Sequence, residues 1–538
     1  MTDRPFPVSN ECDRGSPAIG NQTSRFHPDL SWLLVCGACY SILLCLTISG
    51  WSLWTDEAFS AYIASHTTLK LLVTTLAAGD SSDLQTAMYY LYLHWWTGIF
   101  GISEVALRSA NIPFIVTFAF ALPWISWRAF RSRWLWIVPA SLPFLWAYAP
   151  QVRAYFSLIA FSTVCLGCLL AYLHRPSERE RRVLPWILLG SLFAGTTFDM
   201  LMLLAVPPMV ALMATYDRRR IRTADWTPSL KAFAFPFLAL FSYLAWTFGR
   251  GTAYDYAKPG VLSMASVFYR FVGLLGYGPN RRYDTPFHPY LFGMVAAALV
   301  LLAGVTAAVI AGMRGKGRPL LISLSWGLAL AVIEVVVLSV IIQQQIELRH
   351  LAALVPLLVI WPLAALVEPL KGRPSKLAWV SVGLLIAVWL VADYRLLFLS
   401  EYKEEDFRSA VNKAIELHRQ FGAEIALVGD PAAGAYYGLD LHGEKPCFPL
   451  TDDCGSGFRK TSWPRNAPAA YAMLWKQPQV YSWLASANRE HVPTVVIMSR
   501  SRHPIFSDSA WWPILRSKTE AYIYSAHGFW IYFLEPNR

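Results

Sequence analysis

The pattern of apolar residues along the chain predicts a polytopic helical membrane protein. Apolar blocks recur from residue 30 to residue 398 and are separated by short polar segments, and each block is near the roughly 20 residues that a helix needs to cross a bilayer. They are too long and too uniformly apolar for the alternating strands of an outer-membrane barrel. About eleven spans can be placed on this basis, at residues 30–50, 108–129, 134–150, 154–174, 183–198, 199–216, 230–249, 289–312, 319–343, 351–369 and 377–398.

Composition supports this prediction. The chain of 538 residues is 55% hydrophobic and only 15% charged, with a mean hydropathy of +0.38. Ordinary soluble domains carry roughly a quarter charged residues. A chain this long with so few charges has too little polar surface to be soluble.

The distribution of positive charge predicts the topology. The net charge is +11, from 46 Lys and Arg against 35 Asp and Glu. If the basic clusters and the N-terminus face the cytoplasm, every second connection is basic, as the positive-inside rule requires. The basic excess then reflects membrane topology, and binding of nucleic acid is not predicted. The clusters are Arg128, Arg131 and Arg133; Arg175, Arg179, Arg181 and Arg182; Arg218, Arg219, Arg220 and Arg222; Arg314, Lys316 and Arg318; and Lys371, Arg373 and Lys376.

With this orientation, residues 51–107, 149–153, 250–288 and 343–350 face outward, together with everything after residue 400. Residues 88–100 are too short to span and are rich in Tyr and Trp, so we expect an interfacial helix there.

Three regions are predicted along the chain. Residues 1–29 are polar with no cleavable signal, so they form a cytoplasmic tail before an uncleaved first anchor. Residues 30–399 form the transmembrane module. Residues 400–538 have mixed composition, with a helical pattern at 404–421 and strand-like runs at 424–429, 494–498, 522–524 and 530–533, which predicts a soluble α/β domain on the outer side. Cys447 and Cys454 lie in that domain, and a disulfide between them suits an oxidising compartment but is not required.

The segment directly outside the first span, residues 51–60 (WSLWTDEAFS), is the first candidate for chemistry. Asp56 and Glu57 lie between interfacial Trp residues and an apolar continuation, so at least one carboxylate should be partly desolvated. A desolvated carboxylate can act as a general base toward a hydroxyl. The alternative is an acidic helix start, because Thr55 or Asp56 is a suitable N-cap.

Several further motifs accompany this segment. Trp54-Thr-Asp-Glu-Ala58 follows the first span, the aromatic helix with Tyr89 and Tyr90 ends at Phe100-Gly101, and Ser-Glu-Val-Ala-Leu-Arg follows at 103–108. Together they resemble the GT-C membrane glycosyltransferases, more narrowly the branch of the protein O-mannosyltransferases, the lipid A aminoarabinose transferase and the Rgt-type galacturonic acid transferases. Residues 151–155 (QVRAY) are similar to that family's Arg-x-Tyr, and residues 348–351 (LRHL) with Pro356 to its Arg-Tyr-Leu…Pro. The resemblance covers residues 30 to 400 in order and spacing.

Departures from the family pattern concern histidines. Where relatives commonly have His-Pro-Pro-Leu-Tyr-Tyr, residues 85–90 read QTAMYY, and Thr-His-Tyr appears as TTF at 196–198. Carboxylates without these histidines form an incomplete zinc site. No metal ligand is therefore assigned, and a divalent metal is compatible with the site but is not predicted to be essential.

The resemblance implies a sugar donor on a polyprenyl phosphate and an acceptor hydroxyl from the outer side. Asp56 is the expected base, and Glu57 would orient the acceptor or Asp56. Arg153 and Arg349 would meet the leaving phosphate. The alternative for both arginines is snorkelling to lipid headgroups.

Other outer-facing residues are weaker candidates for substrate binding. Asp80 and Asp83 either contact the sugar or acceptor or lie in a solvated loop. Asp199 is either functional, as polar groups at membrane depth usually are, or a helix cap. Further candidates for lining the substrate groove are Tyr89, Tyr90, Tyr155 and His350.

The resulting hypothesis is an inverting glycosyltransferase in a bacterial inner membrane, acting on its periplasmic side. The acceptor class stays open among lipid A or lipopolysaccharide core, another cell-envelope glycan and protein. A transporter or flippase for a lipid-linked saccharide is the alternative, although no internal repeat is visible. A non-catalytic scaffold would leave the Asp-Glu pair and both arginines unexplained.

Overall fold

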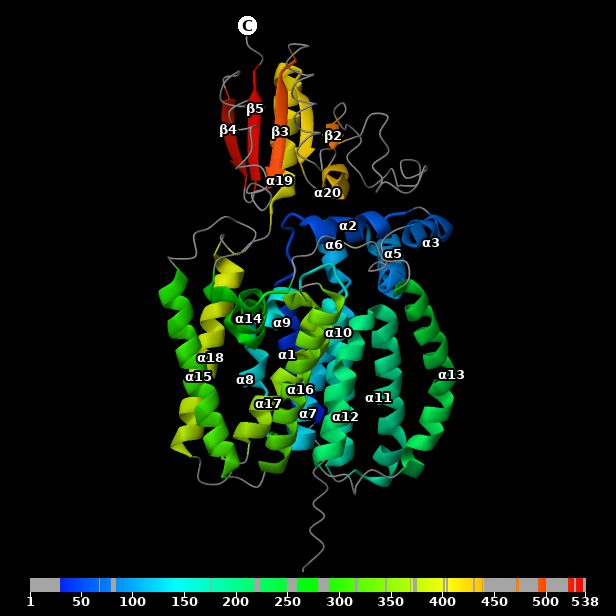
Figure 1. Cartoon of the computed structure of the whole chain (residues 1–538), viewed down its shortest axis with the longest axis vertical. Coiled ribbons are helices and arrows are strands. Elements are labelled where there is room, and N and C mark those ends of the chain that lie inside the picture. Colours follow the sequence, from blue (N-terminus) through cyan, green and yellow to red (C-terminus); the bar gives the residue numbers. More distant parts are fainter. Residues whose placement is uncertain are drawn as a thin grey trace, which may run out of the picture.

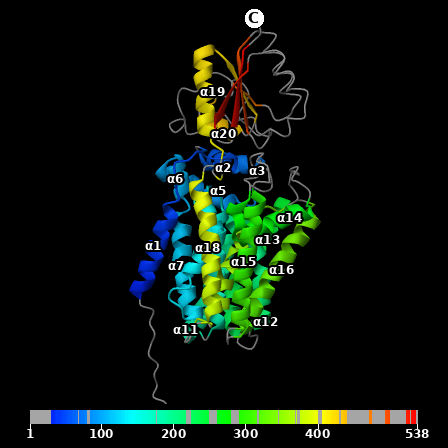
Figure 2. The ribbon, with the colours of Figure 1, turned by 90° about the vertical axis from the view of Figure 1, so that its left-hand side faces the viewer.

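A bundle of long helices carries a small sheet domain at one end (Figure 1). Short helices lie between the two, and the rotated view shows the same three levels (Figure 2). The structure is a computed structural model. It describes residues 30–66, 68–78, 84–174, 176–216, 223–248, 259–278, 290–314, 318–343, 346–367, 369–370, 375–399, 402, 405–428, 431–437, 439, 471–473, 492–499, 521–526 and 529–535.

The bundle confirms the prediction of a polytopic helical membrane protein. Within the described residues, seven helices are long and apolar enough to cross a membrane, and three shorter apolar helices accompany them. The bundle helices are α1 (Leu30–Cys45), α7 (Ile112–Phe130), α10 (Tyr155–Leu173), α11 (Glu178–Phe198), α12 (Val206–Tyr216), α13 (Thr223–Phe248), α15 (Leu291–Met313), α16 (Arg318–Ile342), α17 (Val355–Leu366) and α18 (Lys376–Phe398).

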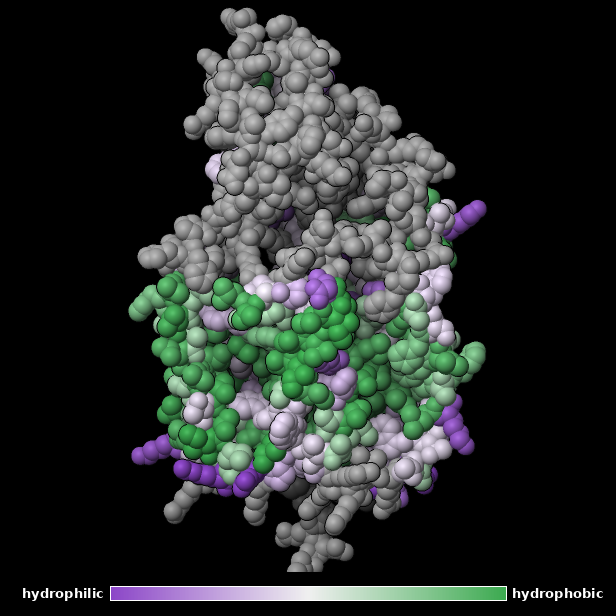
Figure 3. Space-filling view, viewed as in Figure 1, coloured by the Kyte–Doolittle hydropathy of each residue, from purple (hydrophilic) through white to green (hydrophobic). Residues whose placement is uncertain are grey.

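The outer surface of the bundle is apolar. Figure 3 shows a band of apolar side chains across the face in view, with hydrophilic residues gathered at the end away from the sheet domain. Phe235, Phe292 and Ile341 are 76%, 87% and 70% exposed. Because contiguous apolar surface of this extent is rare on soluble proteins, the band is the surface that faces lipid.

The predicted span at residues 134–150 differs from a regular helix. It is divided into α8 (Ile137–Ala140) and α9 (Pro143–Tyr148), with Leu142 in an extended conformation between them. Proline has no N–H and disfavours helical geometry in the residue before it, and Pro143 acts on Leu142 in this way. Phe144 and Leu145 are fully buried, and irregular backbone is tolerated at membrane depth where protein covers it.

The predicted outer segment at residues 250–288 also contains more structure than a loop. It includes α14 (Val261–Tyr269), a π-helical turn (Arg270–Leu274) and the 3-10 helix η4 (Leu275–Tyr277). Val267, Phe271 and Leu274 belong to the main core, so this part of the segment packs into the bundle. The apolar side chains at 267, 271 and 274 have helical spacing. This short pattern lies inside a long segment with polar ends, so the sequence did not indicate a packed helix there.

Among the described residues, four short helices lie between the bundle and the sheet: α2 (Thr55–Ala64), α3 (Leu69–Ala78), α5 (Ala87–Phe100) and α6 (Glu104–Ser109). Helix α5 confirms the helix predicted over residues 88–100. Tyr90 and Leu93 are buried, whereas Trp95 and Ile99 are 60% and 76% exposed. This division into two faces suits a helix at a membrane boundary.

The described parts of the C-terminal region form a five-stranded sheet in the order β2-β1-β3-β5-β4. Strand β1 is parallel to β2 and β3, and β5 is antiparallel to β3 and β4. Helix α19 packs on the sheet, with the rings of Phe407 and Phe529 4.5 Å apart. The predicted α/β character is confirmed. The elements are α19 (Phe407–Phe421), β1 (Glu424–Val428), α20 (Pro431–Tyr436), β2 (Tyr471–Met473), β3 (Thr494–Ser499), β4 (Ala521–Ala526) and β5 (Phe529–Leu534).

Candidate active site

The first turn of α2 presents its two carboxylates to different surroundings. Asp56 and Glu57 are the second and third residues of the helix, where the helix dipole favours negative charge. Successive helical residues are turned about 100° from each other, so the two side chains point in different directions. Glu57 is 1% exposed, whereas the Asp56 side chain is 22% exposed.

Glu57 is held from several sides inside the protein. Arg108 Nη2 donates to Oε2 at 2.6 Å and Arg108 Nε to Oε1 at 3.2 Å. The Val152 amide also donates to Oε1, at 3.0 Å, and the Trp54 amide to Oε2, at 3.4 Å. Both of its oxygens therefore accept hydrogen bonds from the protein, and they connect α2 to Arg108 and to the 149–154 connection.

The ion pair of Glu57 and Arg108, here called the clamp, also holds the segment before α2, because Arg108 forms further hydrogen bonds there. It donates through Nη1 to the carbonyl oxygens of Ser49 and Trp51, at 2.9 and 2.6 Å, and through Nη2 to that of Ser52 at 3.1 Å. The residue belongs to the 103–108 motif, but its partners could not be predicted from that motif. The clamp fixes where α2 begins.

Asp56 lies between the two arginines that the sequence singled out. Arg349 Nη1 donates to Asp56 Oδ2, and Arg153 Nη2 lies 4.0 Å from the same oxygen. The two arginine side chains are 17% and 21% exposed. The structure thus brings together three residues from widely separated parts of the chain at the end of the bundle below the sheet domain.

Arg153 is oriented by hydroxyl groups of the outer helices. Its Nη1 donates to Tyr90 Oη at 3.0 Å and to Ser60 Oγ at 3.2 Å. The side-chain amide of Asn111 holds the preceding connection through the Ala149 and Gln151 carbonyls, at 3.0 and 2.6 Å. Ser60 was not anticipated, although it lies one helical turn after Asp56.

Arg349 lies in the 3-10 helix η6 (Leu348–Leu354). Its guanidinium group is 2.8 Å from Glu347 Oε2 and stacks over the Trp54 ring at 5.9 Å. His350 accepts the Glu347 amide through Nδ1 at 3.2 Å, which closes the first turn of η6. His350 is half-buried. Through its hydrogen bond with the Glu347 amide, it stabilises the start of the helix that contains Arg349.

The two remaining tyrosine candidates are buried. Tyr89 is 1% exposed, and its hydroxyl has no hydrogen-bond partner among the described residues. Tyr155 is 5% exposed and packs edge-on against Tyr148 with ring centroids 5.7 Å apart. Tyr89 lies close enough to Arg153, and Tyr155 to Arg349, for electrostatic interaction.

Asp199 caps the 3-10 helix η1 (Met200–Ala205) and interacts electrostatically with Arg153. Its Oδ1 accepts the Leu201 amide at 2.9 Å. Burial raises the pKa of Asp199 to about 7, and the Leu201 amide and Arg153 oppose this only in part. The cap interpretation is therefore supported, and the carboxyl also lies close enough to affect the arginine.

The raised pKa of Asp199 predicts a pH-dependent stability. The folded protein binds the Asp199 proton more tightly than the unfolded chain. This proton therefore stabilises the folded state fully below about pH 4, and the stabilisation is lost as the pH rises through about 7. We expect Asp199→Asn, which stays neutral, to gain on the order of 2–4 kcal/mol of stability relative to wild type between pH 4 and pH 8. Melting temperatures of both proteins in detergent across this range test it, and a constant difference would rule the titration out.

Some candidates lie outside the described residues, namely Asp80, Asp83, Cys447 and Cys454. Among the residues that the structure does describe, no three His, Cys, Asp or Glu side chains are grouped so as to hold a metal ion. That essential metal is absent from the reaction stays a prediction.

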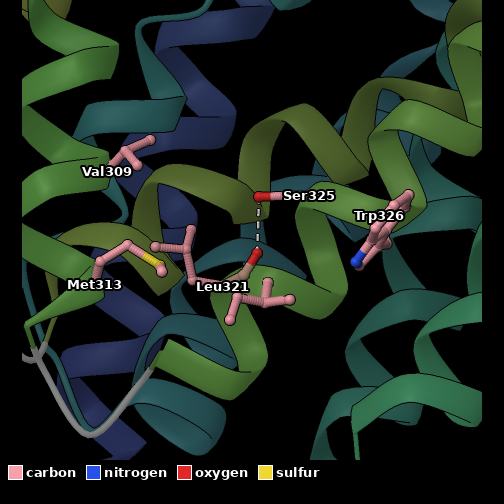
Figure 4. A pocket seen from close by; sticks show the side chains of 6 residues that line it. Val309, Met313, Leu321, Ser325 and Trp326 are labelled. Carbon is pink, nitrogen blue, oxygen red and sulfur yellow. Dashed lines mark hydrogen bonds between the residues drawn. The ribbon is translucent and has the colours of Figure 1, made fainter.

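A cavity of about 350 Å³ lies in the bundle and is distinct from the site (Figure 4). Its one hydroxyl, on Ser325, donates to the Leu321 carbonyl at 2.8 Å. The cavity is next to the beginning of α16, whereas Arg349 follows the end of that helix. It offers no charged group for catalysis, and its lining residues are Val309, Met313, Leu321, Ile322, Ser325 and Trp326.

Comparison with known proteins yields a likeness to solved structures alone. No family model matches the chain, and no curated protein matches it. Two crystal structures of ArnT from Cupriavidus metallidurans are similar to it, one bound to undecaprenyl phosphate and one in the apo state, with TM-scores of 0.49 and 0.48. Each is 12% identical and covers 94% of this chain and 98% of the ArnT chain. The function is therefore inferred from this chain's own side chains.

Proposed function

We propose that the protein is an inverting glycosyltransferase that moves a sugar from a polyprenyl phosphate to an acceptor hydroxyl. The single observation that carries this proposal is the placement of Asp56 between Arg349 and Arg153 at one end of a membrane bundle. A general base beside two cations provides what such a transfer requires. The motifs around these three residues support the same function.

The two arginines are the groups proposed to bind the donor phosphate. A guanidinium group matches phosphate geometry through two parallel hydrogen bonds, and Arg153 and Arg349 both lie within 4.0 Å of Asp56 Oδ2. A donor phosphate at the membrane surface would compete with Asp56 for these groups. Binding of the donor would thereby release the carboxylate next to the acceptor.

The transfer is a single displacement. Asp56 accepts the proton of the acceptor hydroxyl, and the acceptor oxygen forms a bond to the anomeric carbon. The bond between that carbon and the phosphate oxygen breaks, and polyprenyl phosphate leaves with the electron pair toward Arg153 and Arg349. With one base and no covalent sugar–enzyme intermediate, the anomeric configuration of the product is inverted.

The cellular setting follows from the same hypothesis. We infer a bacterial inner membrane from the resemblance to the Rgt-type transferases. We assign the site and the C-terminal domain to the periplasmic side, because the described basic residues Arg314, Arg318 and Lys376 flank connections at the opposite end of the bundle, and basic connections face the cytoplasm. The acceptor would be a glycolipid such as lipid A or lipopolysaccharide core, another envelope glycan or a protein.

Replacing Arg349 with glutamine is expected to weaken binding of a polyprenyl phosphate about 10- to 100-fold, which corresponds to one charged hydrogen-bonded contact. Undecaprenyl phosphate and undecaprenol, titrated into the purified protein in nanodiscs, separate recognition of the phosphate from recognition of the chain. The matched control is Arg314→Gln, at the far end of α15, which should bind like wild type. Equal affinity of Arg349→Gln and wild type for the phosphate would exclude Arg349 from the donor site.

A further inference from the structure

The C-terminal domain contacts the chain segment immediately before Asp56. Tyr437, just after α20, accepts the Leu53 amide at 2.6 Å and the Ser52 hydroxyl at 3.1 Å through its phenolic oxygen. Tyr437 is 8% exposed, and Ser52 and Leu53 are 2% and 0% exposed. A side chain 384 residues further along the chain thus accepts the hydrogen bond of the buried Leu53 amide, three residues before Asp56.

Two neighbouring residues of the domain strengthen this contact. The Arg408 amide donates to Ser52 Oγ at 3.1 Å, while its guanidinium group donates to the Gly50 carbonyl at 2.7 Å and to Glu104. The Tyr436 hydroxyl donates to the Ile102 carbonyl at 2.5 Å. The domain therefore forms hydrogen bonds with two segments, the one before α2 and the one at the start of α6.

The segment that the domain contacts is also the one whose carbonyl oxygens accept hydrogen bonds from Arg108. The Ser52 carbonyl accepts a hydrogen bond from Arg108 at 3.1 Å, and the Ser52 hydroxyl donates one to Tyr437. Leu53 and Ala58 also share one hydrophobic core with Phe407 and Val411 of the domain. The beginning of α2 is thus held by Arg108 of α6 and by the C-terminal domain.

We propose that the C-terminal domain is a positioning element for Asp56, and that the Tyr437 hydroxyl is its principal contact. This inference rests on the proposed function, because it assigns the domain to the site where Asp56 acts. Tyr437 does not touch Asp56. It holds the Leu53 amide, and through it the start of the helix that aims the carboxylate.

The test replaces Tyr437 with phenylalanine in the full-length protein, which removes the hydroxyl and preserves the ring. The matched control is Tyr524→Phe on β4, whose half-buried ring contacts Lys413 and makes no described contact with residues 50–53. Hydrogen exchange followed by mass spectrometry reports on the Leu53 amide. We expect exchange of that amide to be about 10-fold faster in Tyr437→Phe, as for loss of one buried hydrogen bond, and unchanged in the control.

Turnover supplies the second readout. Because the donor phosphate is assigned to Arg153 and Arg349, we expect Tyr437→Phe to lower kcat about 10-fold while KM for the donor changes little. Ser52→Ala, which removes the other hydroxyl of the contact, should also lower kcat and should add little to Tyr437→Phe in the double variant. This second variant keeps the test decisive if Tyr437→Phe is poorly folded.

Each outcome has a distinct meaning. Unchanged exchange at Leu53 in Tyr437→Phe would show that the contact does not hold the segment, and faster exchange with unchanged kcat would show that it does not position Asp56. Either result overturns the inference. A wild-type protein that transfers no sugar would refute the proposed function, while the exchange result would still decide whether the domain holds this segment.

Discussion

Replacing Asp56 with asparagine is expected to lower the rate of glycosyl transfer about 100- to 10,000-fold, the range typical of losing a general base. Asparagine keeps the shape of the side chain and an oxygen for Arg349, so the fold should be preserved. The substitution removes the group that takes the proton of the acceptor. The rate of sugar transfer from polyprenyl-linked donors to endogenous acceptors in isolated membranes measures the effect.

The matched control is Asp406→Asn at the start of α19. Asp406 accepts the Ser409 amide at 3.1 Å as an N-cap, and asparagine caps a helix about as well as aspartate. Both variants lose one carboxylate on the same side of the bundle, but only one should lose activity. Transfer by Asp56→Asn at the wild-type rate would exclude a role for this carboxylate in proton removal.

Replacing Arg108 with methionine is expected to destabilise the protein by about 3–5 kcal/mol, because it leaves a buried charge without its partner. Glu57 would keep only two backbone donors, and the Ser49, Trp51 and Ser52 carbonyls would lose a donor they now share. Thermal unfolding in detergent measures the loss.

The comparison for Arg108 is Lys413→Met on α19. Lys413 pairs with Glu416 at 2.8 Å, and these side chains are 28% and 60% exposed. An exposed pair contributes at most about 1 kcal/mol, so this variant should unfold close to wild type. Equal stability of Arg108→Met and Lys413→Met would mean that the clamp does not hold the start of α2.

The hydrophobic pattern predicted the bundle well because lipid imposes length and polarity on each span. It missed where the backbone leaves regular helix, at α8 and α9 and at η6. Those departures depend on Pro143 and on coverage by neighbouring helices, and coverage is a property of the assembled bundle. A run of apolar residues in the sequence looks the same whether it forms one continuous helix or a broken one.

The residues of the site divide in a similar way. Asp56, Arg153 and Arg349 could be found because each lies at the outward-facing end of an apolar span, in a short motif that resembles the GT-C pattern. The division of labour between Asp56 and Glu57 could not be found, since it depends on Arg108, 51 residues away, and on the Val152 amide. The contact with Tyr437 is still further from sequence reasoning, because a tyrosine in a soluble domain shows no sign of its partner.

The most direct test of the central claim is mass spectrometry of envelope glycolipids, glycans and glycoproteins from cells that lack the gene. The cells are complemented with wild type, with Asp56→Asn or with Asp406→Asn, all at equal protein levels. The proposed function predicts that one sugar-sized mass disappears in the deletion strain and returns with wild type and with Asp406→Asn but not with Asp56→Asn. Unchanged glycans in the deletion strain, or equal restoration by Asp56→Asn, would contradict Asp56-dependent glycosyl transfer.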